Sequence, residues 1–280
     1  MNFRNLLKPA VITGIFCCAS FSVFSQGFYA KLSGGYNFGI GSQFGQNAYT
    51  VTSWNQDNNG FQTKEDVKRV RVNFGKGFTG SAAFGYMFTE QLGAEIEVGY
   101  LIGGKNNTSY QDIFNPDPEQ SRQGNSEMYA RMATFQPSLV MAIKLSENLN
   151  LQSKFGIVTG TGTIFVNDNR ISDGYDVTKE SEYNGGWGFG LQGALGLDYK
   201  LNGKYAVFSE IKMSNLSYAP TKYKLTKVTV NGVEEPYLPE HSETSLENSY
   251  TNEDFQRKVT LKYPFTFSTV GLQVGLKYNF

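Results

Sequence analysis

Cysteine and histidine are scarce in this 280-residue chain, which contains two cysteines and one histidine. Both cysteines, Cys17 and Cys18, lie in an apolar segment at the N-terminus. Removal of that segment would leave no thiol, disulfide or Cys-ligated metal site. Charge is also low, because only 18% of the residues are charged and 25 basic side chains balance 25 acidic ones. No net field attracts nucleic acid, so nucleic-acid binding is not expected.

Long apolar runs are missing after the N-terminus, and the mean hydropathy of the chain is -0.36. A membrane-spanning helix needs about 20 consecutive apolar residues, whereas a tilted strand needs only about 9–11 with alternate ones apolar. The chain is rich in Gly (31), Phe (22) and Tyr (17). This composition disfavours membrane helices and is compatible with a membrane β-barrel.

The first 25 residues have the layout of a signal peptide. Arg4 and Lys8 precede an apolar run from Ala10 to Phe24, and the small residue Ser25 follows. We expect cleavage after Ser25, which leaves residues 26–280 as the mature domain. A lipoprotein signal is the less favoured alternative, because the residues before the two cysteines do not match a lipobox.

From residue 27 onward the sequence alternates between two kinds of side chain. Large apolar residues occupy one face of each segment, and small or polar residues occupy the other, as expected for two-faced strands. Eight segments show this pattern: 28–40, 74–88, 92–102, 129–145, 149–165, 187–199, 205–216 and 270–280.

The connections between the segments alternate in length. Residues 89–91, 146–148 and 202–204 are short, and residues 41–73, 103–128, 166–184 and 217–262 are long. This arrangement predicts an all-β fold, a transmembrane antiparallel up-and-down β-barrel of eight strands with short periplasmic turns and long extracellular loops. The two longest connections have room for another hairpin, so ten strands is an alternative. An Asn-Gly pair in Val228–Val233 predicts a hairpin that projects beyond the membrane, with an edge open to a partner strand.

The large apolar side chains on one face of every strand would form a surface that aggregates in water. A soluble barrel such as a lipocalin buries its apolar face, whereas here that face is expected to contact lipid and the polar face to line the lumen. Because eight strands leave an interior just filled by side chains, we expect a structural network of paired charges rather than a proton or ion path. The predicted lumen charges are Glu95, Glu97, Lys154, Asp198, Glu210, Lys212 and Lys277.

The C-terminal segment Val270–Phe280 alternates strictly and ends in Phe. With the eight segments, it resembles the OmpA/OmpX-type family of small outer-membrane barrels across residues 27–280. The resemblance implies location in the cell outer membrane, contact with its lipids and lipopolysaccharide, and recognition by the barrel-assembly machinery through Leu276, Tyr278 and Phe280. It covers the barrel domain only, so no periplasmic domain or cell-wall tether is implied.

Few residues suggest chemistry. Barrel enzymes that act on lipid A use His with Ser, but His241 stands alone in a long polar loop and is interpreted as solvated. We therefore predict no catalytic residue and no cofactor. The stretch Asp57–Gly60 and the loop acids lack the spacing of a calcium site, so no metal is expected. Those acids are Glu234, Glu235, Glu240, Glu243, Glu247, Glu253 and Asp254.

Lys76 and Arg131 fall just above the apolar bands of their strands. Arg and Lys suit phosphate oxygens, so these two side chains are candidate contacts for lipopolysaccharide. Ordinary interfacial charges that extend into water are an equally good interpretation.

Architecture and analogy favour a non-enzymatic barrel that supports envelope integrity or presents loops for adhesion and recognition. A small passive channel or transport accessory is the alternative, and it requires a continuous wet lumen. A lipid-modifying barrel enzyme is a third class, for which the sequence offers no catalytic group at the barrel wall.

Overall fold

The computed structural model describes residues 27–41, 43–56, 60–115, 122–172, 174–235, 243–247 and 259–280. The predicted signal peptide lies outside these residues. Within them no helix is long and apolar enough to cross a membrane.

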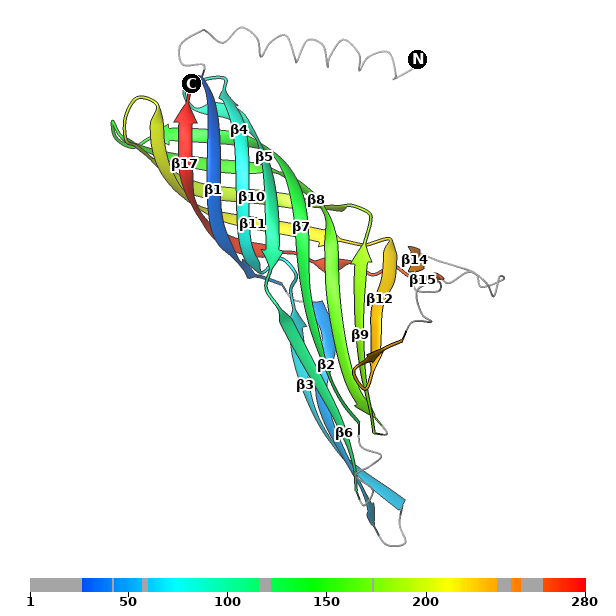
Figure 1. The fold of residues 1–280 in the computed structure, drawn as a ribbon. Helices are drawn as coiled ribbons and strands as arrows, with labels where there is room; N and C mark the ends of the chain where they lie inside the picture. Colours follow the sequence, from blue (N-terminus) through cyan, green and yellow to red (C-terminus); the bar gives the residue numbers. More distant parts are fainter. Residues whose placement is uncertain are drawn as a thin grey trace, which may run out of the picture.

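Eight strands close into a barrel (Figure 1). Each strand pairs antiparallel with the next around the ring, and the last returns to the first through the register Lys31↔Lys277. This confirms the predicted strand number of the barrel. In ring order the strands are β1 (Gly27–Gly39), β4 (Gly77–Met87), β5 (Leu92–Gly103), β7 (Arg122–Lys144), β8 (Leu149–Ser172), β10 (Gly188–Lys200), β11 (Tyr205–Tyr218) and β17 (Thr269–Asn279).

Short turns join the strands at one end, the periplasmic end. The turn between β4 and β5 closes through Phe88 N–H, which donates to Leu92 O at 2.8 Å. The side chain of Asn202 accepts from Tyr205 N–H at 2.8 Å in the turn between β10 and β11. β17 ends beside these turns, where Phe280 N–H donates to a carbonyl of β1 at 3.0 Å.

Beyond the other end of the barrel the long connections form strands of their own. β7 and β8 continue past the ring and form the centre of a second assembly, which we call the extracellular sheet (Figure 1). Its order is β3-β2-β6-β7-β8-β9-β12-β14-β15, and the β2–β6 and β14–β15 pairs are parallel. The added strands are β2 (Gln43–Gln56), β3 (Gly60–Val72), β6 (Asn106–Asn115), β9 (Tyr175–Asn184), β12 (Lys222–Val230), β14 (Glu243–Glu247) and β15 (Val259–Leu261).

Two short strands complete the fold. β13 (Val233–Glu234) pairs with β12 across the predicted Asn-Gly turn, in which Asn231 and Gly232 have φ of 51° and 79°. Both positive values belong to the turn that tight hairpins favour. β16 (Phe265–Thr266) pairs with the end of β11 and leads the chain back to the barrel.

The polarity of the two faces inverts along β7, although the even-numbered side chains point inward throughout. Within the barrel wall Phe135 and Leu139 point outward and are 43% and 59% exposed, while Gln136 is buried inside. Beyond Phe135 the inward side chain is Met132, which is 1% exposed, and Arg131 faces outward. The outer surface contacts lipid below this point and water above it, so the inversion marks the extracellular boundary of the membrane.

Aromatic side chains gather at both boundaries. At the extracellular boundary the ring of Tyr36 lies 5.0 Å from the rings of Phe38 and Phe78. At the periplasmic boundary the rings of Tyr278 and Phe280 are 5.0 Å apart. These are the two girdles expected of a transmembrane barrel.

Candidate functional site: a filled lumen beneath an extracellular sheet

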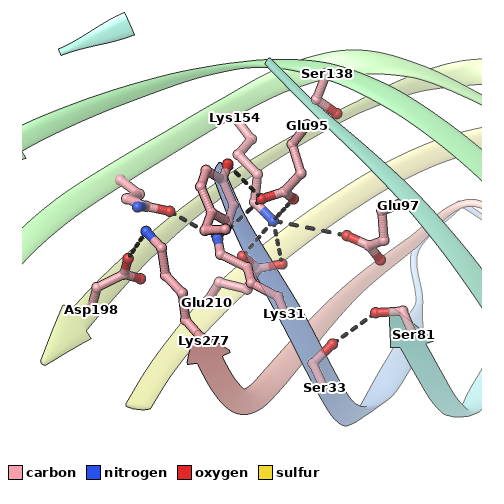
Figure 2. Close-up of polar contacts among 12 residues, drawn as sticks. Lys31, Ser33, Ser81, Glu95, Glu97, Ser138, Lys154, Asp198, Glu210 and Lys277 are labelled. Atoms are coloured by element: carbon pink, nitrogen blue, oxygen red, sulfur yellow. Dashed lines mark hydrogen bonds and ion pairs between the residues drawn. The ribbon is translucent and has the colours of Figure 1, made fainter. Parts of the chain in front are cut away.

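The lower lumen holds a cluster of buried charges centred on Glu95. Its carboxylate accepts hydrogen bonds from Lys154 at 2.8 Å and from the Tyr29 hydroxyl at 2.9 Å. Lys31 Nζ lies 3.2 Å from the same carboxylate and donates to Gln152 at 2.9 Å. Figure 2 shows Glu95, Lys154 and Lys31 converging from different strands across the barrel.

Further ion pairs surround this centre. Lys154 Nζ lies 2.8 Å from Glu210, Lys212 lies 2.6 Å from Glu97, and Lys277 lies 2.8 Å from Asp198. The cluster therefore balances four lysines against four carboxylates, and buried charges need such partners. The structure places all seven predicted lumen charges in this cluster: Glu95, Glu97, Lys154, Asp198, Glu210, Lys212 and Lys277.

Sequence reasoning missed Tyr29 as a member of the cluster. Tyr29 shares the inward parity of Lys31 and is 1% exposed. The signal is Gly85, which is opposite Tyr29 on β4. A Cβ at Gly85 would collide with the tyrosine ring, so only glycine leaves room for it.

A small cavity of about 60 Å³ lies above the charge cluster, lined by polar residues and by apolar ones such as Leu101, Val158 and Phe267. Its lining includes Glu97, Lys212, Thr79 and Gln136. Thr79 Oγ1 and Gln136 Oε1 are buried and have no hydrogen-bond partner among the described residues. A space of this size has room for a few water molecules and not for a continuous water column.

The extracellular mouth of the barrel is closed by apolar side chains, which we call the apolar plug. Phe267 lies 5.9 Å from both Phe74 and Tyr218, measured between ring centroids. The Tyr218 hydroxyl donates to Gly162 O at 2.6 Å and fixes its ring across the mouth. The buried residues of the plug are Val72, Phe74, Leu101, Met132, Val158, Leu216, Tyr218 and Phe267.

The plug was not foreseen from the sequence, which suggested polar side chains along the whole inward face. Its residues belong to the strand ends and connections above the membrane boundary, where the outer surface is wet. Because water has replaced lipid outside, apolar side chains there are buried by pointing inward. Knowledge of the boundary would have revealed them.

Asn73 fastens the connections above the plug. Its side-chain amide donates to Gly41 O at 2.9 Å and to Ser268 O at 2.8 Å, and its carbonyl accepts from Gly75 N–H at 2.9 Å. Asn106 donates to Asn73 O at 3.2 Å. Asn73 thereby joins, by hydrogen bonds, the segments that follow β1 and β5 to the segments that precede β4 and β17.

The other predicted site residues lie at the membrane boundaries or outside the described residues. Lys76 Nζ donates to Lys105 O at 3.0 Å, and the Arg131 guanidinium lies 5.6 Å from the centre of the Phe165 ring. Of the proposed assembly signal, Phe280 is 69% exposed and Leu276 57% exposed on the outer surface. The remaining candidates His241, Asp57, Glu240, Glu253 and Asp254 lie outside the described residues.

Comparison with known proteins gives one family and several distant structural likenesses. A family model described as outer membrane protein beta-barrel domain matches residues 16–234. No curated protein matches the sequence.

Three solved structures illustrate the structural likeness. Ail, the attachment invasion locus protein of Yersinia pestis, is 12% identical, with 90% of this chain and 98% of that chain covered and a TM-score of 0.30. OprG from Pseudomonas aeruginosa is 13% identical, with 91% and 93% covered and a TM-score of 0.38. A major outer membrane protein from Thermus thermophilus is 13% identical, with 92% and 100% covered and a TM-score of 0.41.

Proposed function

Because the chain belongs to the outer membrane protein beta-barrel domain family, we propose that it is a non-enzymatic surface-recognition protein of the outer membrane. The barrel anchors the extracellular sheet, and the sheet binds a partner outside the cell. One observation carries this proposal: the charge cluster and the apolar plug fill the lumen, whereas the strands continue outward into a large sheet.

The filled lumen argues against a passive channel. An ion crossing the barrel would have to separate Lys154 from Glu95 and Glu210, whose atoms lie 2.8 Å away. Breaking a buried ion pair costs about 3–5 kcal/mol, and the apolar plug adds a dry barrier above it. Passage of an ion therefore requires rearrangement of both the charge cluster and the apolar plug.

The way in which the extracellular sheet is connected to the barrel favours a role in recognition. β7 and β8 pair with each other from Arg122↔Ser172 at the outer tip to Lys144↔Asn150 at the periplasmic end. The sheet is thus a continuation of the barrel wall rather than a set of separate loops. Binding surfaces held on a rigid scaffold lose little freedom when a partner binds.

Conductance of the refolded protein in planar bilayers tests the filled lumen. We expect no steady conductance from the unaltered protein, nor from Glu97→Gln or Glu210→Gln, because each substitution leaves the plug in place. Steady conductance that these substitutions alter would overturn the proposal in favour of a channel.

Removal of β2 and most of β3 from the edge of the extracellular sheet tests recognition. Asn73 holds Gly41 at 2.9 Å, so a short linker can replace residues 43–71 without stretching the barrel. We expect cells carrying this deletion to lose attachment to surfaces or to other cells while the heat-modifiable barrel remains. Full attachment by the deletion variant, with a loss of detergent resistance only when the whole protein is absent, would assign an envelope-integrity role instead.

A further inference from the structure

The geometry points to a binding site for an acidic saccharide on the inward face of the extracellular sheet, and this inference rests on the proposed recognition function. A groove of about 510 Å³ lies on this face. It extends over β6, β7, β8, β9 and β12, beyond the apolar plug, and we call it the inner groove.

The floor of the inner groove consists of neighbouring residues on paired strands. Ser126 on β7 is opposite Asp168 on β8, which is opposite Lys179 on β9. In the next row outward, Gly124 is opposite Arg170. All share the inward parity of the lumen residues, so their side chains belong to one surface.

Ser126 provides the observation that points to a ligand. Ser126 is only 6% exposed, and its hydroxyl has no hydrogen-bond partner within the described part of the chain. A buried hydroxyl without a partner destabilises a protein. A hydroxyl-rich ligand in the groove would supply the missing partner.

Two tyrosines give the groove apolar flat surfaces. The Tyr110 ring lies across Gly124, where a Cβ would collide with it. Tyr175 is 57% exposed at the outer end of the groove. One face of a sugar ring carries mainly C–H groups, and such a face packs well against an aromatic ring.

The charges select an acidic ligand. Arg170 and Lys179 contribute two positive charges to the groove, against one negative charge from Asp168. A guanidinium and an ammonium recognise a carboxylate through charge-assisted hydrogen bonds. Aromatic faces, a buried hydroxyl and net positive charge together fit a uronic-acid chain better than a peptide, which would pair with a strand edge.

Titration of the whole protein in detergent with tetragalacturonate tests the inference. Maltotetraose, a neutral chain of the same length, serves as the reference ligand. We expect tetragalacturonate to bind at least tenfold more tightly. Purified lipopolysaccharide forms a third arm: competition with tetragalacturonate would assign the acidic sugar to the envelope, and its absence would assign a soluble polysaccharide.

Variants distinguish binding from folding. Ser126→Ala should weaken binding about tenfold without loss of stability, because it removes a hydroxyl that has no partner in the free protein. Lys179→Gln should weaken binding similarly. Lys227→Gln is the matched control, because Lys227 lies on the face of the sheet opposite to the inner groove. There it is in register with Glu180, and its Nζ lies 3.9 Å from Glu234.

Two results would overturn the inference. One is equal or absent binding of the two tetrasaccharides. The other is unchanged affinity in Ser126→Ala and Lys179→Gln, which would mean that water alone satisfies the hydroxyl. Attachment of cells that persists in these variants but is lost when residues 43–71 are deleted would leave the recognition function intact, so the two proposals fail separately.

Discussion

Replacement of Glu95 by Gln perturbs the centre of the lumen charge cluster with little change in volume. The carboxylate faces Lys154 at 2.8 Å and Lys31 at 3.2 Å, and accepts the Tyr29 hydroxyl at 2.9 Å. Lys154 keeps Glu210 at 2.8 Å. Within the described residues, Lys31 has no other carboxylate at ion-pair distance, so the substitution leaves one buried ammonium without a counter-charge.

The expected loss of stability follows from this imbalance. Removing one partner of a buried ion pair costs about 3–5 kcal/mol. The Gln side chain can still accept one hydrogen bond, so we expect Glu95→Gln to lower the free energy of unfolding by about 3 kcal/mol. In a Lys31→Met background the same substitution should cost about 1–3 kcal/mol less, because the unpaired ammonium is absent.

Urea unfolding of the protein in lipid vesicles, followed by tryptophan fluorescence, measures these differences. Glu127→Gln is the matched control, because Glu127 pairs with Lys105 at 2.9 Å on the surface. Exposed pairs contribute about 0–1 kcal/mol. A loss below 1 kcal/mol for Glu95→Gln, equal to that of the control, would refute the view that the cluster stabilises the barrel.

Three further predictions concern the lumen packing, the membrane boundary and the C-terminal signal. Gly85→Ala should cost about 1–3 kcal/mol in the same unfolding assay because its Cβ meets the Tyr29 ring, whereas Gly80→Ala, with only a backbone oxygen 4.0 Å away, should be neutral. Joint replacement of Lys76 and Arg131 by Gln should lower the lipopolysaccharide retained by the purified barrel, and unchanged retention would remove these contacts. Phe280→Ala should reduce the amount of folded protein in the outer membrane more than Phe38→Ala, which removes an exposed ring at the opposite boundary.

The barrel could be predicted because lipid imposes a simple pattern. Every second side chain in the wall must be apolar, and the strand has to alternate for its full length across the bilayer. Segment 187–199 shows this with few exceptions, and the structure has β10 at Gly188–Lys200. The inward charges followed from the same parity, since a lysine such as Lys154 cannot face lipid at low cost.

The pairings of the extracellular sheet could not be predicted in the same way. β2 pairs in parallel with β6, with Tyr49 opposite Tyr110, although the two strands are separated by β3, β4 and β5. No local turn fixes such a register. Hairpins did carry a local signal, as at Asn231 and Gly232, where the backbone requires positive φ at both positions.

The inward face of β8 shows how one strand can serve three environments. Its even-numbered residues change from Lys154 in the charge cluster to Val158 in the apolar plug and then to Arg170 in the inner groove. Each change follows from what surrounds the strand at that height: lipid outside and a narrow lumen, then water outside and a closed mouth, then an open sheet. A strand of 24 residues is longer than a bilayer requires, so its length is itself the sign that part of it works outside the membrane.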